Sequence, residues 1–121
     1  MVSTRARNVH EPRVCAIGDD WQMEFDCTDQ ADAPLELLGA QSIEWRLTDA
    51  TGSQIALLTQ ANGDIVVLPE PDEVTRSKCV VWFKSELTAT LVPGIYIDRL
   101  RITTYEGITT TQSIGSIEVK A

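Results

Sequence analysis

The stretch "ELTATLVPGIYIDRLRI", residues 86–102, decides the fold, because a sharp turn signal stands directly before a tyrosine and a clean alternation. Proline presets φ, and glycine adopts backbone conformations that other residues avoid, so the pair marks an abrupt change of chain direction. A tyrosine just after such a turn can return its hydroxyl to the backbone a few residues upstream. We therefore interpret Leu91, Pro93, Gly94 and Tyr96 as a structural lock and not as a binding site.

The same period of two runs through most of the chain. In "WQMEFDC" (21–27) and "SIEWRLT" (42–48), apolar side chains alternate with polar ones, which is typical of half-buried antiparallel strands. Hairpin or tight-turn signals follow in "DATGS" (49–53), "QANGD" (60–64) and "YEGI" (105–108).

Residues 77–83, "SKCVVWF", are apolar along nearly their whole length, which predicts a central strand covered on both faces. Trp21, Trp45 and Trp82 all fall on strand positions that we expect to face the core. The alternative for these tryptophans is a row of exposed aromatics that stacks on sugars.

Three local features refine this pattern. Asp98 falls on the core-facing register of its strand, so we expect it near a sheet edge and paired with an arginine. The spacing between Ile114 and Ile117 slips across Gly115, where a bulge restores the inward face. Residues 85–91 allow a single helical turn, with Ser85 as its cap.

Seven or eight short strands with turns every 8 to 12 residues indicate an all-β protein, a single Ig-like or fibronectin-like antiparallel β-sandwich. In such sandwiches a tyrosine corner lies at the E–F turn, where residues 91–96 place it. We assign residues 14–121 to the sandwich and residues 1–13 to a flexible basic arm.

Charge separates the arm from the body. Residues 1–13 carry Arg5, Arg7 and Arg13 against Glu11, a net charge of +2. Because the whole chain has a net charge of −8, residues 14–121 carry −10. An acidic body argues against direct nucleic-acid binding, which requires cations to neutralise phosphates. The arm is either a frayed terminus or a segment that docks on an acidic neighbouring subunit, in which case the three arginines are the partner-binding residues.

The cysteines and the hydropathy place further limits. Cys15, Cys27 and Cys79 show no close CxxC pair, and each lies in an apolar strand-like run, so we expect buried reduced thiols; the alternative is one disulfide and one free thiol. No apolar run approaches the ~18 residues of a membrane span, and no secretory signal is visible. These features predict a soluble protein that is made in the cytoplasm, or that leaves it by a route that needs no cleaved signal.

Enzyme motifs are absent from the sequence. The only histidine is His10, and no P-loop, GxSxG, HExxH or dinucleotide fingerprint occurs, so we expect neither catalysis nor a cofactor. An acidic cluster remains, which we interpret as a solubilising surface at a sheet edge: Asp19, Asp20, Glu24, Asp26, Asp29, Asp32 and Glu36. The alternatives are a calcium site at residues 26–32 and a paired-carboxylate hydrolase.

The order of the landmarks resembles the small Ig-like domain of many tailed bacteriophages and prophages, exemplified by the N-terminal domain of siphophage baseplate upper proteins. The resemblance covers roughly residues 15–120. It is carried by residues 37–40 (with Leu38 where the family usually has threonine), by the corner from Thr88 to Tyr96, and by the terminal strand 115–119.

The resemblance implies a non-enzymatic virion structural protein, such as a tail, baseplate or neck component, made in the host bacterial cytoplasm. Its partners are then other virion proteins in a symmetric multi-copy assembly. Baseplate upper proteins continue into helical and receptor-holder regions, which this sequence lacks, so its place in the particle stays open. Two alternatives remain: an Ig-like decoration or adhesion module that binds host-surface glycans on a capsid or fibre, and a cellular domain such as a chaperone or adhesin fragment.

Overall fold

The computed structural model describes residues 8–9, 13–68 and 77–121, and its elements are short strands with one helical turn. In chain order the elements are β1 (Asn8–Val9), β2 (Arg13–Ala16), β3 (Trp21–Asp26), β4 (Ser42–Thr48), β5 (Gln54–Thr59), β6 (Ile65–Val67), β7 (Lys78–Phe83), α1 (Ser85–Thr88), β8 (Gly94–Thr103) and β9 (Thr109–Lys120). No helix in the described part of the chain is long and apolar enough to cross a membrane.

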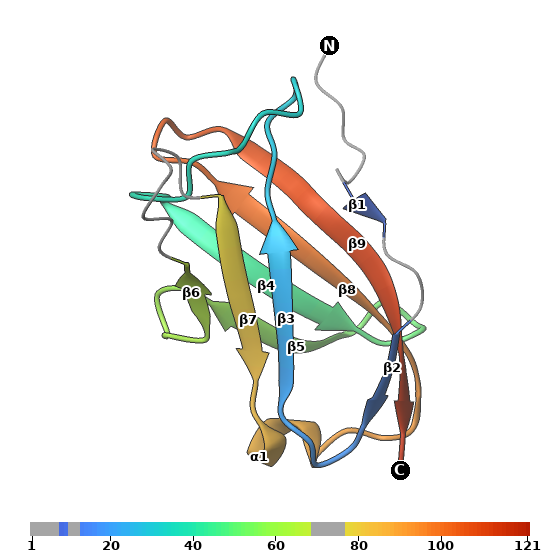
Figure 1. Ribbon diagram of the computed structural model, residues 1–121. Helices are drawn as coiled ribbons and strands as arrows, with labels where there is room; N and C mark the ends of the chain where they lie inside the picture. Colours follow the sequence, from blue (N-terminus) through green and yellow to red (C-terminus); the bar gives the residue numbers. More distant parts are fainter. Residues whose placement is uncertain (1–7, 10–12, 69–76) are drawn as a thin grey trace.

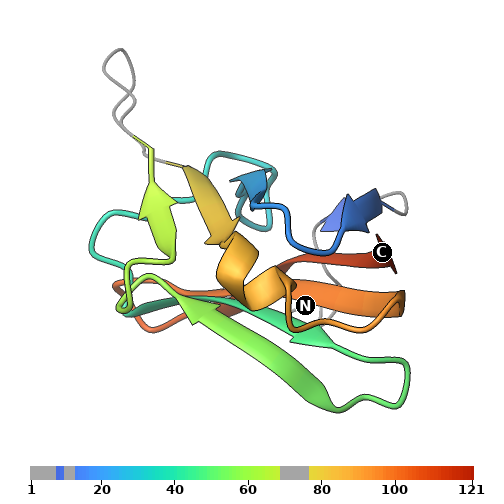
Figure 2. The same cartoon turned by 90° about the horizontal axis from the view of Figure 1, so that it is seen from below.

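The strands form two sheets that face each other as two layers (Figures 1 and 2). The larger sheet has the order β1-β9-β8-β4-β5, with β2 also paired to β9, and the smaller sheet has the order β3-β7-β6. Strands β1 and β2 run parallel to β9, and every other pairing between the described strands is antiparallel. This arrangement is an Ig-like β-sandwich, as the sequence predicts.

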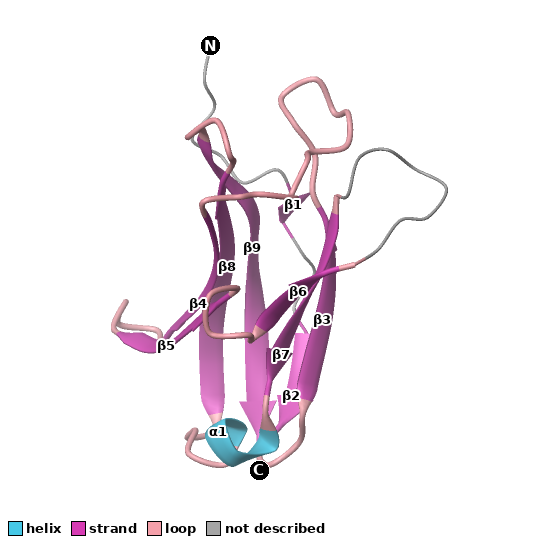
Figure 3. Cartoon of the chain, turned by 90° about the vertical axis from the view of Figure 1, so that its left-hand side faces the viewer, coloured by secondary structure: helices cyan, strands magenta, loops and turns pink. Residues whose placement is uncertain are grey.

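The tyrosine corner forms as predicted. The Tyr96 hydroxyl donates to the Val92 carbonyl oxygen over 2.7 Å and accepts from the Val92 N–H over 3.3 Å. Tyr96 and Leu91 are buried, whereas Pro93 is exposed in the turn that leads into β8. The corner follows α1 at one end of the sandwich (Figure 3), so it fixes the path by which the chain passes from the smaller sheet to the larger one.

The core lies between the two sheets and is built around aromatic rings. Trp45 is fully buried, and its ring meets Phe83 edge-on with centroids 5.6 Å apart. Phe83 in turn meets Trp21 edge-on at 5.3 Å. Two of the three tryptophans therefore fill the core as predicted.

The prediction for Trp82 is wrong, because this side chain is 43% exposed. Residues of β7 alternate between buried and outward positions, and the outward positions hold Val80 and Trp82. The strand is central in its sheet, but only one face of that sheet packs on another layer. The other face is open, so a nearly continuous apolar run does not mean burial on both sides.

The turns at 49–53 and 105–108 connect hydrogen-bonded neighbours, β4 with β5 and β8 with β9, so the hairpin expected at the first and the tight turn expected at the second are confirmed. The hairpin expectation for residues 60–64 is wrong. That turn carries the chain from β5 in the larger sheet to β6 in the smaller one. A turn dipeptide fixes the local direction of the chain and not the partner of the next strand.

Two finer expectations also differ from the structure. The register of β9 shifts opposite Leu100 and Arg101, so the bulged residue is Gln112 and not Gly115. The amide of Gln112 turns inward, where it donates to the Thr28 carbonyl and accepts from the Thr28 N–H, each over 3.0 Å. The helical turn begins after Lys84, so Ser85 is its first residue and not its cap.

The boundary of the arm is likewise different. Strands β1 and β2 pair with β9 between Ser113 and Lys120, so Asn8–Val9 and Arg13 belong to the larger sheet. These two short strands bring the described total to nine, above the seven or eight expected. The edge of β9 offers unpaired backbone groups, and a polar segment without hydrophobic periodicity can still satisfy them. Arg5 and Arg7 lie outside the described residues.

We expect Tyr96→Phe to lower the free energy of unfolding by ~1–2 kcal/mol, because the hydrogen bond from the buried Tyr96 side chain to the Val92 carbonyl is lost. Chemical denaturation of both proteins measures this difference. Partner binding should remain once the variant is folded. A variant of unchanged stability that no longer binds would make the corner a site.

Candidate functional site

A buried ion pair lies between the sheets at Asp98. Its side chain has no exposed surface, and one carboxylate oxygen accepts from Arg13 while the other accepts from Trp45 Nε1 over 3.0 Å. The expected pairing with an arginine is confirmed. The expected position near an edge is wrong, because β8 is the central strand of the larger sheet. Asp98 is tolerated in the core because both of its oxygens are hydrogen-bonded.

This pairing changes the interpretation of Arg13. Its side chain is 28% exposed, and its guanidinium is directed to Asp98 within the same chain. Arg13 therefore contributes to the sandwich and is not the free contact residue that the sequence suggested. Partner binding by Arg5 and Arg7 stays a prediction.

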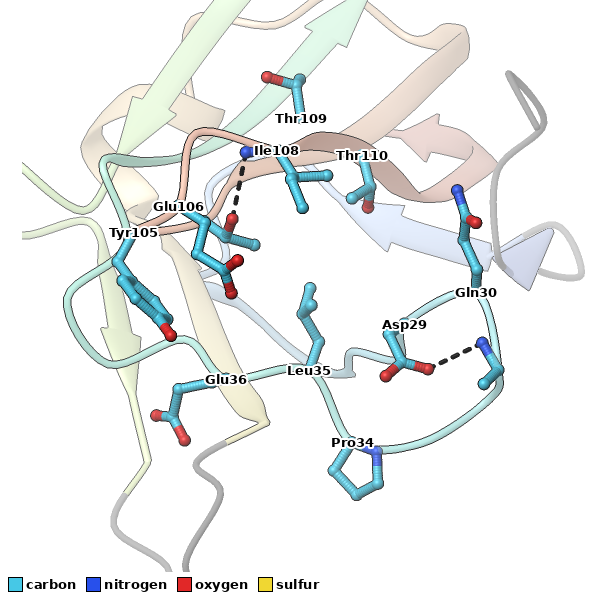
Figure 4. Close-up of a pocket in the computed structure, with 12 residues that line it drawn as sticks. Asp29, Gln30, Pro34, Leu35, Glu36, Tyr105, Glu106, Ile108, Thr109 and Thr110 are labelled. Atoms are coloured by element: carbon cyan, nitrogen blue, oxygen red, sulfur yellow. Dashed lines mark hydrogen bonds between the residues drawn. The ribbon is translucent and has the colours of Figure 1, made fainter. Parts of the chain in front are cut away.

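A groove lies at one end of the sandwich, between the β3–β4 connection and the β8–β9 hairpin. It encloses a cavity of about 650 Å³. Leu35 and Ile108 point toward each other across it, and Tyr105 lies at one end near Glu36, with Asp29 and Gln30 at the other (Figure 4). In antibody variable domains, the loops at the corresponding end, B–C and F–G, bind antigen.

The groove combines apolar surface with negative charge. Asp29, Glu36 and Glu106 line it, and none of the described residues that line it is cationic. Tyr105 is 59% exposed, so its ring is available for stacking. The arrangement suits a ligand that offers hydrogen-bond donors beside a flat or apolar surface. Sequence reasoning missed this groove, although "YEGI" placed an aromatic residue and a carboxylate in one tight turn.

The acidic cluster is spread along the molecule. Asp20 accepts the Ser85 N–H over 2.6 Å beside α1. Asp29, after the far end of β3, accepts the N–H groups of Ala31 and Ala33 over 2.8 and 3.0 Å. No group of three His, Cys, Asp or Glu side chains in the described ranges is placed to hold a metal ion together.

The three cysteines are free thiols, as predicted. Cys27 and Cys79 are buried, and Cys15 is partly exposed. A hydrogen bond with the Cys79 thiol is the main cause, and burial the second, of a Cys27 pKa far above its usual range. Burial also raises the pKa of Cys15. Both pKa shifts disfavour the reactive thiolate form, so neither Cys15 nor Cys27 has the character of a nucleophile.

A second surface is the outer face of the larger sheet, which we call the front face. Four aliphatic side chains are exposed there by between 37% and 54%: Ile55, Leu57, Ile95 and Ile97. Arg46 and Arg99 are cross-strand partners in β4 and β8 and lie among them. Together with Thr48, Gly52 and Ile97, the two arginines line a shallow hollow of about 200 Å³.

Comparisons with known proteins give structural neighbours of low similarity. No family model and no curated protein matches the chain. CopC from Methylosinus trichosporium OB3b is 11% identical with a TM-score of 0.41, over 97% of this chain and 88% of that one. A family 123 glycoside hydrolase from Clostridium perfringens is 14% identical at 0.46, over 93% of this chain and 23% of that one. Murine CRIg is 13% identical with a TM-score of 0.39, over 91% of this chain and 92% of that one. At such scores we transfer nothing of these proteins' activities.

We expect Arg13→Met to lower the free energy of unfolding by about 3 kcal/mol, because it leaves the Asp98 carboxylate buried without its cation. The double variant Arg13→Met, Asp98→Asn should be more stable than Arg13→Met alone, since the asparagine is neutral and its oxygen still accepts from Trp45. Denaturant titrations of the three proteins provide the comparison. Equal stability of the single and double variants would show that the buried charge is not the cause.

Alkylation should distinguish the three thiols. In the folded protein near neutral pH, iodoacetamide should label Cys15 slowly, because its raised pKa keeps the thiol protonated, and should leave Cys27 and Cys79 unmodified, because both are buried. In denaturant all three should react. Peptide mass spectrometry assigns the sites, and rapid labelling of Cys27 in the folded protein would contradict the buried position.

Proposed function

We propose that this chain is a non-enzymatic structural protein of a tailed bacteriophage or phage-like particle, acting through protein–protein assembly. The front face carries the proposal. Its exposed aliphatic side chains lie beside arginines, as in surfaces that bury apolar contacts inside a polar rim.

The resemblance to phage Ig-like domains supports the virion setting. Its landmarks occupy structural positions in the sandwich: the corner leads into β8, and residues 115–119 belong to β9. Because these landmark residues stabilise the sandwich itself, the outer faces of its two sheets remain available for partners. The arm residues Arg5 and Arg7 add a cationic segment that suits acidic surfaces of neighbouring subunits.

Purified particles from the source of the gene provide the test. Mass spectrometry should find the protein at many copies per particle, and electron microscopy should locate an Ig-like density on the tail, baseplate or neck. A protein absent from intact particles would refute the proposal. Replacing Arg5 and Arg7 with glutamate should lower its copy number if the arm docks on an acidic neighbour.

The groove favours a second candidate function, a decoration or adhesion module that binds host-surface glycans. An exposed tyrosine flanked by carboxylates can stack on a sugar ring and accept its hydroxyl hydrogens. The other exposed tryptophan or tyrosine among the described residues, Trp82, lies on β7 in the smaller sheet, away from the groove. The groove therefore offers one aromatic residue and not a platform.

Glycan-array binding distinguishes the two functions. If the groove binds glycans, Tyr105→Ala should abolish binding and Trp82→Ala should leave it unchanged. The assembly proposal predicts that neither the native protein nor these two variants bind glycans.

A further inference from the structure

We propose that the front face of one copy binds the outer face of the smaller sheet of a second copy, so that copies stack front to back. We call the second surface the back face. The inference rests on the proposed assembly function and names the partner as another copy of this chain. It follows from the unequal distribution of charge and apolar surface over the two faces.

The front face is cationic although the protein is anionic. Outward-facing positions of β4, β8 and β9 carry Arg46, Arg99, Arg101 and Lys120 against Glu44 and Glu118, so four cations oppose two carboxylates. Glu44 and Glu118 lie 3.6 and 3.5 Å from Arg46 and Lys120. No such contact is found for Arg99 or Arg101 with any described residue. Arg46 Nε is buried and has no hydrogen-bond partner in the described chain.

The back face carries Glu24 and Asp26 on its edge strand against Lys78 and Lys84 at the two ends of β7, and the segments that flank β3 add further carboxylates. Residues 14–43 contain seven carboxylates and no lysine or arginine. Two of them, Glu24 and Asp26, point outward from β3, which is an edge strand of the smaller sheet. Lys78 lies opposite Asp26 in the neighbouring strand. Acidic positions therefore follow β3 along its whole length, with Asp19 and Asp20 before it and Asp29 after it.

Apolar groups match across the same two faces. Trp82 and Val66 are 43% and 55% exposed on the back face, and Lys84 lies over the Trp82 ring with Nζ 5.9 Å from its centroid. Trp82 is the cross-strand partner of Gln22, one outward position from Glu24. Arg46 and Arg99 line the hollow on the front face, and guanidinium groups are planar cations on which an indole can stack. Trp82 thus fits as the anchor of the contact.

Charge also selects this arrangement over the symmetric ones. Two front faces would oppose Arg99 and Arg101 to the same arginines, and two back faces would oppose Glu24 and Asp26 to the same carboxylates. Like charges held opposite each other in an interface are unfavourable. Front to back, the arginines meet carboxylates. A contact between two different faces is heterologous, so it produces a closed ring or an open row and not a two-fold dimer.

Complementary charge reversals test the inference with the full chain at low ionic strength. The front variant carries Arg99→Glu and Arg101→Glu, and the back variant carries Glu24→Lys and Asp26→Lys. Each variant alone should be monomeric by light scattering, because one of its two surfaces is blocked. Mixed together, they should associate, since the intact front face of one binds the intact back face of the other and the two reversed faces are also of opposite charge.

A chain with all four reversals should associate again, because both surfaces have changed sign together. Trp82→Ala should weaken association on the order of tenfold or more. Leu87→Ala is the matched control: Leu87 on α1 is also 43% exposed but lies on neither face, and its replacement should have no effect.

The outcomes separate cleanly. A monomeric native chain, or a mixture that stays monomeric, would overturn the inference, and so would association of the back variant alone, which would indicate front-to-front contact. Presence of the protein in particles is decided by the separate mass spectrometry, so the assembly function can stand if front-to-back binding fails. A chain absent from particles that still stacks would instead refute the virion setting alone.

Discussion

The buried Asp98 carboxylate is the constraint on which the rest of the sandwich depends. A charge in the centre of the larger sheet is stable only while Arg13 and Trp45 satisfy it, so three strands far apart in sequence must meet at one point. This requirement draws β2 against β9 and fixes Trp45 in the orientation in which its ring meets Phe83. The tyrosine corner then secures the entry to β8, the strand that carries the carboxylate.

The packing of the core also determines which side chains face outward. Alternation along β4 and β8 directs Trp45 and Leu100 inward, and the same alternation leaves Arg46 and Arg99 on the front face. Along β3 it leaves the carboxylates outside. The polarity of the two outer faces is therefore a direct consequence of strand register, and a slip by one residue in β3 would turn Glu24 and Asp26 into the core. Fold and charge separation are specified by the same residues.

Much of this architecture could be predicted from local patterns, because strand alternation and the proline-glycine turn are properties of neighbouring residues. The main failures concern which distant segment a strand or turn packs against. Trp82 lies on a strand whose apolar run suggested two covering layers, and the turn at 60–64 looked like a hairpin but joins the two sheets. The groove brings together Leu35 and Ile108, which are 73 positions apart, and no short-range signal marks such a meeting. The mismatch at Asp98 was visible because a charge on an apolar register conflicts locally.

The parallel pairing of β1 and β2 with β9 has a practical consequence for how the chain is joined to anything else. Strand β9 begins beside the groove and runs toward the end that holds α1 (Figure 1), so Lys120 leaves the sandwich at the end opposite the groove. A label or fused domain attached after Ala121 therefore projects beside the corner and leaves the groove accessible.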